Sequence, residues 1–199
     1  MTTIPFAGFP KIKRLSRGCL VTEKIDGTNA QIYITDAGDF CVGSRNRWLT
    51  PDSDNYGFAR WAYDNREELM RLGPGQHFGE WWGCGIQRRY GMKEKVFSLF
   101  DTNRWAQKHS RRLPLMGYNL LSEETQQYPP DCCEVVPELY RGEFKTDVID
   151  MVLENLERSG SLAADGFDRP EGIIVKHWET GVMFKKTLDN DGHKSTGSR

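Results

Sequence analysis

One lysine stands where a strand-like stretch ends and a second one begins. Residues 22–29 read TEKIDGTN, so Lys24 is followed closely by the turn-forming pair Asp26-Gly27. We expect this position to hold the amine on rigid elements at the rim of a sheet. A lysine amine is a nucleophile only when it is deprotonated, and a cationic or desolvating environment favours that form. Lys24 is therefore a candidate nucleophile, although a plain turn would explain the K-x-D-G pattern alone equally well.

Other charged and aromatic residues recur in or beside apolar strand-like stretches. In chain order they are Arg45, Glu80, Phe100, Asp101, Glu171, Lys176, Lys185 and Lys186. Glu80 lies inside the run FGEWWG at residues 78–83, where a carboxylate is costly unless it has a partner or a ligand. Glu171 and Lys176 bracket a second apolar run. These acids therefore need either structural ion pairs or a bound ligand.

Short strand patterns dominate the chain. The predicted strands cover residues 18–24, 29–35, 40–44, 76–82, 95–101, 134–139, 172–177 and 181–186. One helix is predicted over residues 56–72, and a second one is capped by Thr146 and stops before Gly160. Hairpins with a few interspersed helices favour an α+β domain of packed antiparallel sheets with flanking helices over a doubly wound parallel sheet.

The composition sets outer limits on what the protein can be. The chain has 199 residues, of which 38% are hydrophobic and 28% charged, as is typical of a soluble globular protein. No apolar run approaches the roughly 18 residues of a membrane helix, and no secretory signal is recognisable. The five cysteines show no C-x-x-C spacing. This argues against a disulfide framework or a zinc site and favours a cytoplasmic location.

The net charge of −1 gives the molecule no overall attraction for nucleic acid. A polyanion would have to bind local clusters of basic residues. The two candidate clusters are Lys11, Lys13, Arg14 and Arg17 near the start, and Arg88, Arg89, Lys93 and Lys95 in the middle. Either cluster could equally be a solvated face.

Taken in order, these residues resemble the motifs of the covalent nucleotidyltransferase superfamily, which comprises DNA ligases, RNA ligases and mRNA capping enzymes. Residues 24–27 (KIDG) are similar to its motif I. Glu80 is similar to the motif III acid, and residues 100–101 (FD) to the aromatic motif after it. Residues 171–176 and 185–186 are similar to motifs IV and V. Five motifs in the right order are far more specific than any one of them.

Within this superfamily the sequence is most similar to the phage-type, nick-sealing RNA ligases. That similarity is carried by EKIDGTN at residues 23–29, by Arg45, by FGEWWG at residues 78–83 and by PEGIIVK at residues 170–176. Motif V usually has two lysines separated by one residue, whereas this chain has two adjacent lysines. The resemblance therefore leaves open which of Lys185 and Lys186 faces the nucleotide.

The resemblance implies an ATP-dependent RNA ligase with the adenylation fold of ligases. Lys24 would attack the α-phosphate of ATP, release pyrophosphate and carry AMP as a lysyl adenylate. The AMP would pass to an RNA 5′-phosphate, and an RNA 3′-hydroxyl would displace it to seal the strand. The implied cofactors are ATP and Mg2+ (or Mn2+), and the implied partner is RNA with 5′-phosphate and 3′-hydroxyl ends.

The resemblance also implies a role for each matched side chain. Glu80 and Glu171 would serve the ribose hydroxyls and bind a metal ion through water. Phe100 would stack on adenine opposite Ile174, and Glu23 would touch the adenine edge. Catalysis would fall to Lys24, Asp26, Glu171, Lys185 and Lys186, and the remaining contacts to ribose or phosphates to Asn29, Arg45 and Lys176. The alternatives are structural salt bridges for the two glutamates and core packing for Phe100 and Ile174.

The expected organisation is a nucleotidyltransferase domain over residues 1–188 and a polar tail over residues 189–199. We expect no oligonucleotide-binding (OB-fold) barrel after motif V, which argues against a DNA ligase or a guanylyltransferase. A nucleotide-binding subunit that needs a partner subunit stays an alternative. RNA would lie on the catalytic domain itself, over basic residues such as Lys13, Arg17, Arg88, Arg89 and Lys93.

Overall fold

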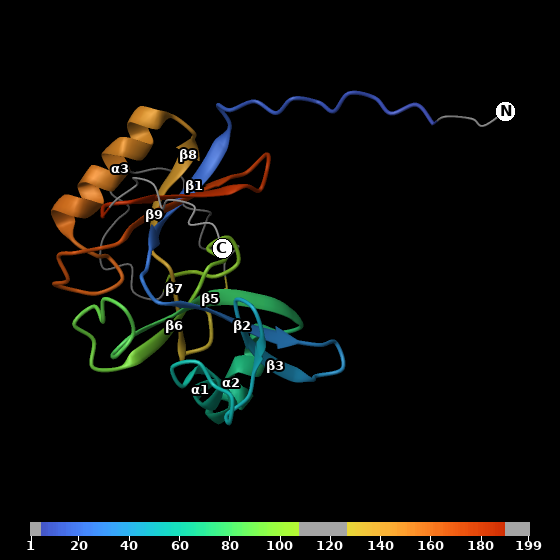
Figure 1. The fold of residues 1–199 in the computed structure, drawn as a ribbon, viewed down its shortest axis with the longest axis vertical. Coiled ribbons are helices and arrows are strands. Elements are labelled where there is room, and N and C mark those ends of the chain that lie inside the picture. Colours follow the sequence, from blue (N-terminus) through green and yellow to red (C-terminus); the bar gives the residue numbers. More distant parts are fainter. Residues whose placement is uncertain (1–4, 108–126, 190–199) are drawn as a thin grey trace, which may run out of the picture.

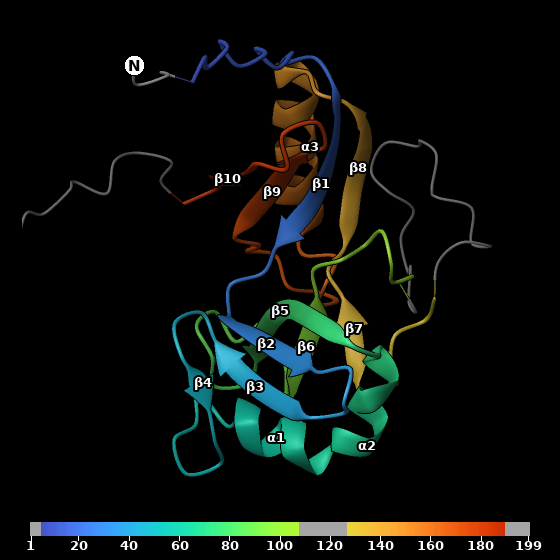
Figure 2. The ribbon, with the colours of Figure 1, turned by 90° about the vertical axis from the view of Figure 1, so that its right-hand side faces the viewer.

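The computed structural model describes residues 5–107 and 127–189, which form two β-sheets with flanking helices (Figure 1 and Figure 2). The four-stranded sheet, sheet A, has the strand order β10-β9-β1-β8, and the six-stranded sheet, sheet B, has the order β4-β3-β2-β5-β6-β7. All neighbouring strands are antiparallel except β6 and β7. The expected α+β class of packed antiparallel sheets is confirmed. Of the expected tail, residues 190–199 lie outside the described residues.

Sheet A is covered on one face by a helix. Its strands are β1 (Gly18–Lys24), β8 (Glu138–Glu143), β9 (Gly172–His177) and β10 (Met183–Thr187). Helix α3 (Thr146–Ser159) buries Val152 and Leu156 against Cys19 and Val21 of β1. Because side chains alternate along a strand, the even-numbered residues of β1, Lys24 among them, point to the face opposite α3. That surface is called the Lys24 face below.

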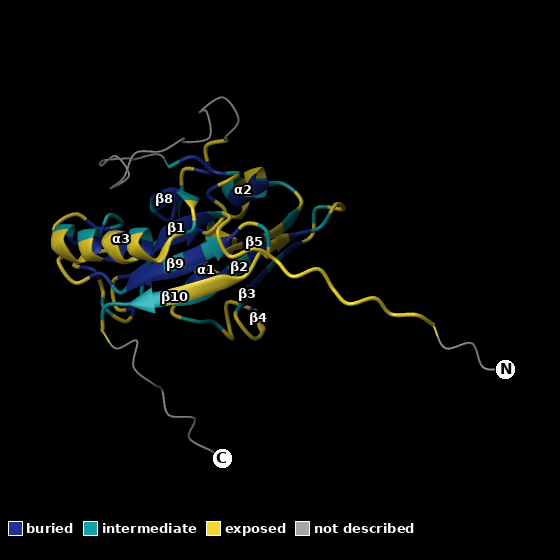
Figure 3. Ribbon diagram, turned by 90° about the horizontal axis from the view of Figure 1, so that it is seen from above, coloured by how far each residue is buried: buried dark blue, intermediate teal, exposed yellow. Residues whose placement is uncertain are grey.

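Sheet B is covered by two short helices. Its strands are β2 (Thr28–Ile34), β3 (Phe40–Ser44), β4 (Trp48–Leu49), β5 (Gly75–Gly83), β6 (Lys95–Leu99) and β7 (Cys133–Val135). Helices α1 (Phe58–Asp64) and α2 (Arg66–Leu69) and the 3-10 helix η1 (Met70–Leu72) pack on one face, with Trp81 and Phe97 in the core between. Figure 3 shows β9 of sheet A buried and the outer side of α3 exposed. Among the helices described, not one has the length and apolar character to cross a membrane.

The chain passes from one sheet to the other directly after Lys24. β1 ends in sheet A and β2 begins in sheet B, so the Asp26-Gly27 turn joins two sheets and is not the tip of a hairpin. A Cβ atom on Gly27 would lie 2.5 Å from the Trp81 carbonyl oxygen and 2.7 Å from Trp82 Cβ. Only glycine therefore fits at this point, where the chain passes close to the backbone of β5. The close approach brings the segment that follows Lys24 into contact with β5.

Several predicted boundaries were wrong. The helix expected over residues 56–72 is broken at Asn65, whose side chain donates a hydrogen bond of 2.8 Å back to the Trp61 carbonyl, as asparagine does at helix ends. Thr146 is the first helical residue and caps nothing, because Lys145 occupies the cap position without a side-chain hydrogen bond. The strand expected over residues 134–139 is divided at Pro137 between β7 and β8, which lie in different sheets. The short strand β4 was not predicted.

Candidate active site

Lys24 and Glu171 meet at the end of sheet A. Lys24 is the last residue of β1 and pairs with Gly172, the first residue of β9. Glu171 directly precedes Gly172 and therefore lies next to the end of β1. The Lys24 Nζ atom donates a hydrogen bond of 2.5 Å to Glu171 Oε2. The two side chains are 23% and 17% exposed, which leaves this ion pair reachable from solvent. The expected nucleophile and the expected motif IV acid are therefore in contact.

Glu80 approaches the same point from sheet B. Its carboxylate accepts hydrogen bonds from the Gly27 N–H at 3.1 Å and from Asn29 Nδ2 at 3.0 Å. Burial raises the pKa of Glu80 to about 7, against the lowering effects of the Asn29 hydrogen bond and the charge of Lys24. The buried carboxylate noted in the sequence is thus hydrogen-bonded by Gly27 and Asn29, which follow Lys24 in the chain. The positive charge of Lys24 is close enough to lower the pKa of this carboxylate.

Strand register separates the two lysines of motif V. Lys185 pairs with Ile174, and Ile174 pairs with Thr22, so all three side chains lie on the Lys24 face. Lys186 points to the other face, where its Nζ atom donates to Asp150 of α3. The structure therefore places Lys185, and not Lys186, on the Lys24 face.

Ile174 and Lys176 also belong to the Lys24 face. They alternate along β9 with the core residues Ile173 and Val175, which pack against α3. Both Ile174 and Lys176 are half-buried. Core packing is thus the role of Ile173, while Ile174 remains accessible.

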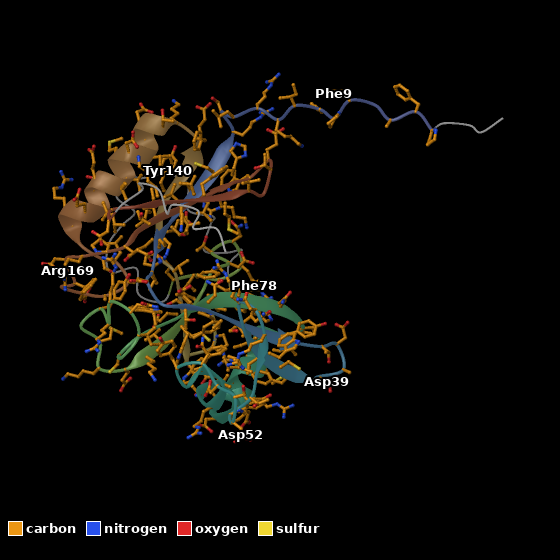
Figure 4. All side chains as sticks on the ribbon, viewed as in Figure 1. Phe9, Asp39, Asp52, Phe78, Tyr140 and Arg169 are labelled. Carbon is orange, nitrogen blue, oxygen red and sulfur yellow. The ribbon has the colours of Figure 1, made fainter. Side chains whose placement is uncertain are left out.

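Phe100 directly follows β6 in sheet B. Its N–H donates a hydrogen bond of 3.0 Å to the Phe78 carbonyl, and its ring is 39% exposed. Figure 4 labels Phe78 on β5, on the side of sheet B away from α1 and α2. Asp101 accepts hydrogen bonds from the N–H groups of Asn103 and Arg104 and so shapes the following turn. Arg45 is exposed immediately after β3.

Glu23 lies on the opposite face of β1 from Lys24 and does not join these groups. Its Oε1 atom accepts a hydrogen bond from the Ser161 hydroxyl at 2.6 Å, and its Oε2 atom accepts from the Leu162 and Ala163 N–H groups at 2.8 and 3.1 Å. Burial raises the pKa of Glu23 to about 7. The Glu23 side chain is thus on the other face of sheet A from Lys24, because strand alternation turns it toward the loop that follows α3. Its expected contact with the adenine edge stays a prediction.

Asp26 is held by two residues that the sequence did not connect with it. Arg88 Nε donates a hydrogen bond of 3.0 Å to Asp26 Oδ2, and the Asp26 N–H donates to Tyr90 Oη at 2.8 Å. Arg88 was expected to contact RNA phosphates, but it already pairs with Asp26 and with Asp189. No local pattern could have revealed this, because the partners lie 62 residues apart in sequence.

The other expected RNA contacts differ in their surroundings. Arg17 pairs with Glu179 at 3.0 Å, whereas Lys13, Arg89 and Lys93 are exposed. Within residues 5–107 and 127–189, no three His, Cys, Asp or Glu side chains come close enough to hold a metal ion by themselves. Any metal ion here would need ligands from a substrate or from water in addition to Glu80 and Glu171.

The comparisons with known proteins concern the family and the fold of the chain. A family model described as RNA ligase matches residues 18–187, and the chain belongs to that family. Two similar solved structures are mutants of the Naegleria gruberi RNA ligase. One, solved with ATP and Mn, has a TM-score of 0.57 and 21% identity, and the match covers 88% of this chain and 51% of that one. The other, solved with AMP and Mn, has a TM-score of 0.56 and 21% identity, with coverages of 87% and 50%.

At this level of identity the similarity to the solved structures shows the fold. The chain spans about half the length of these Naegleria proteins. No curated protein matches it.

Proposed function

We propose that the protein is an ATP-dependent RNA ligase that forms a covalent lysyl-AMP on Lys24. The observation that carries the proposal is the contact between Lys24 and Glu171 at the junction of the two sheets, with Glu80 close by and Lys185 on the same face of sheet A. Membership of the RNA ligase family supports this reading. Residues 1–188 would constitute the adenylation domain.

The first reaction is an in-line displacement at the α-phosphate of ATP. The lone pair of Lys24 Nζ forms the new N–P bond, and the bond from the α-phosphorus to the pyrophosphate oxygen breaks. Lys24 must lose a proton for this, and we propose that Glu171 receives it, since its Oε2 atom lies 2.5 Å from Lys24 Nζ. Lys176 and Lys185 on the same face would offset the charge of the phosphates.

The remaining groups around Lys24 would bind the rest of the nucleotide. Phe100 and Ile174 offer an exposed ring and a half-buried aliphatic side chain for the two faces of adenine. Glu80, oriented by Asn29 and Gly27, would accept hydrogen bonds from the ribose hydroxyls. Glu80 and Glu171 together would hold Mg2+ or Mn2+ through water, and the ion would stabilise negative charge on the phosphates.

In the later steps AMP would pass from Lys24 to the 5′-phosphate of an RNA strand, and a 3′-hydroxyl would then displace it. The proposed substrate is therefore an RNA with these two ends. The proposed location of the enzyme is the cytoplasm. A partner subunit would serve to hold the RNA if the catalytic groups alone bind it weakly.

A labelling experiment tests the proposal directly. The protein is incubated with ATP labelled at the α-phosphate, or with labelled GTP, in the presence of Mg2+, and then denatured. We expect acid-labile label from ATP that survives denaturation and is absent in Lys24→Arg. Equal labelling by GTP, or no labelling at all, would contradict an adenylating ligase.

A further inference from the structure

One guanidinium group contacts three separate segments beside the candidate active site. Arg88 lies between β5 and β6, and its side chain is 23% exposed. Its Nε atom donates to Asp26 Oδ2 at 3.0 Å, its Nη1 atom to the Arg169 carbonyl at 3.2 Å, and its Nη2 atom to Asp189 Oδ2 at 2.6 Å. Arg88 thus joins residues that are distant in the sequence.

Each of these segments carries one residue of the candidate site. Asp26 closely follows Lys24, Arg169 closely precedes Glu171, and Asp189 comes shortly after the strand that contains Lys185. The three strands concerned lie side by side, because Lys24 pairs with Gly172 and Gly172 with Thr187. Arg88 therefore connects, through hydrogen bonds, three segments at the end of sheet A where Lys24 and Glu171 meet.

The backbone around Arg88 adopts an unfavourable conformation. Gln87, Arg89 and Tyr90 have φ values of 44°, 60° and 48°, in the left-handed region that residues other than glycine rarely occupy. Such conformations persist where the surroundings demand them, and they cluster at functional sites. Tyr90 is buried between Trp82 and Phe167 and bonds the Asp26 N–H. Both side chains that this segment directs inward, Arg88 and Tyr90, therefore converge on Asp26.

We infer that Arg88 is a positioning residue for lysyl-AMP formation. It holds the segments of Lys24, Glu171 and Lys185 in register, so that the amine and the phosphate-binding groups keep their mutual distances when ATP binds. The inference rests on the function proposed above. It also replaces the expectation that Arg88 grips RNA phosphates, because two carboxylates already neutralise its charge.

Single-turnover labelling with ATP tests this role. We expect Arg88→Ala to lower the maximal rate of lysyl-AMP formation by about 100-fold at saturating ATP, since small displacements of reacting groups have effects of this order. The ATP concentration at half-maximal rate should change much less. Arg88→Lys should recover part of the rate through one of the three contacts. The control is Arg60→Ala, which removes the same charge from an exposed position on α1 and should label at the wild-type rate.

The possible outcomes are distinct. If Arg88→Ala unfolds, Asp189→Ala is the deciding variant. It removes one contact of Arg88, at a side chain that is 69% exposed, and should lower the rate by a smaller factor. Wild-type labelling rates in folded Arg88→Ala and in Asp189→Ala would overturn the inference, above all if Arg88→Ala instead lost RNA affinity. A wild-type protein that takes no label at all would contradict the proposed function itself.

A second and independent observation concerns the face of sheet B that carries Glu80. Three large aromatic side chains, Tyr33, Trp48 and Phe78, stand exposed on it. Phe78 pairs with Gln31, and a Cβ atom on Gly43 would touch both Gln31 and Trp48 at 3.1 Å, so these side chains adjoin one another. The rings of Tyr33 and Trp48 have centroids 6.2 Å apart. Together with Gln31, these three aromatic side chains form one continuous surface, which we call the aromatic row.

The aromatic row is continuous with the candidate active site. Phe100 hydrogen-bonds Phe78, and the neighbouring pair on β2 and β5 is Asn29 with Glu80. Together with Phe100, which follows β6, the row extends to β4 across four strand spacings, or roughly 19 Å. Arg45, exposed at the end of β3, adds a positive charge at its border. Aromatic rings that alternate with amide side chains suit nucleobases, which stack on the rings and hydrogen-bond the amides.

We propose that the aromatic row binds unpaired bases of the RNA strand whose end reaches Lys24. In a Trp178→Phe background, which removes the exposed tryptophan of sheet A, a short single-stranded RNA should quench the fluorescence of Trp48. Replacing both Trp48 and Tyr33 by alanine should weaken RNA binding about tenfold or more, since each replacement removes a ring on which a base can stack. The control is Phe184→Ala, an exposed ring on the α3 side of sheet A.

Labelling with ATP is measured on the same preparations to show that the Lys24 site is intact. Unchanged RNA affinity in the double variant, or binding of duplex RNA alone without quenching, would overturn the aromatic row as a base-binding site. Loss of ATP labelling in the wild type would instead count against the proposed function.

Discussion

Glu23 and Lys24 are neighbours on β1, yet they belong to two different regions of the molecule. Glu23 points toward α3, where the Ser161 hydroxyl and two backbone N–H groups satisfy both of its oxygens. Lys24 points to the opposite face and meets Glu171, with Glu80 close by. The same division recurs on β10, where Lys186 pairs with a helix residue and Lys185 lies on the Lys24 face.

The two buried carboxylates show what distinguishes these regions. Burial raises the pKa of Glu23 and the pKa of Glu80 to about the same value, 7. A shifted pKa alone therefore does not separate a structural acid from a candidate catalytic one. The difference lies in the partners, since Glu23 is enclosed by a loop of its own chain whereas Glu80 shares its surroundings with Lys24 and Glu171. The following variants test whether this division is also one of function.

The largest effect is expected at Lys24 itself. Lys24→Ala removes the nucleophile, so ATP labelling should fall to background, and Lys24→Arg should fail equally because guanidinium stays protonated. Thermal unfolding of both variants checks that they are folded. Label that persists in either variant would show that another residue is the nucleophile. The Lys24 face would then not be the catalytic one.

A second test sets the two glutamates against each other. Glu80→Gln should slow lysyl-AMP formation about 10- to 100-fold, because a neutral amide with a single acceptor oxygen replaces a carboxylate near the charge of Lys24. Glu23→Gln should label nearly as fast as the wild type, since its amide can accept from Leu162 and Ala163 and donate to Ser161. Equal losses of rate in both variants would show that the helix side of β1 also matters for chemistry.

The adjacent lysines of β10 provide a sharper pair. Lys185→Ala should reduce labelling about tenfold, since one positive charge is lost from the phosphate-binding face. Lys186→Ala breaks only a largely exposed ion pair with Asp150 and should change the rate less than twofold, because such pairs contribute little. Labelling of the two variants at a series of ATP concentrations separates weaker binding from slower chemistry. The opposite ranking would mean that β10 changes register when ATP binds.

The sequence predicted the groups of the candidate site better than their orientation. Lys24, Glu80 and Glu171 could be found because charged residues in or beside apolar strands need an explanation. The faces of Glu23 and Lys186 could not, since they depend on which side of sheet A the helix α3 covers. The contacts of Arg88 were equally hidden, because Asp26, Arg169 and Asp189 come together only through the pairing of β1, β9 and β10. Chain-distant contacts of this kind leave no local pattern.

The smallest predicted effect concerns the stability of the helix side. The pKa of Glu23 lies at about 7 in the folded protein, above its ordinary value of 4.5, so the folded state binds this proton more tightly than the unfolded chain does. With respect to this group, the free energy of unfolding is highest below pH 4.5, decreases as the pH rises to about 7, and then stays low. The total decrease is at most about 3 kcal/mol. Glu80 contributes in the same direction over the same range, so only a difference between variants isolates Glu23. In urea unfolding from pH 5 to pH 8, Glu23→Gln should lose less stability than the wild type while its labelling with ATP persists. If both lose the same amount, the proton of Glu23 does not contribute, and the three hydrogen bonds keep this carboxylate ionised throughout the range.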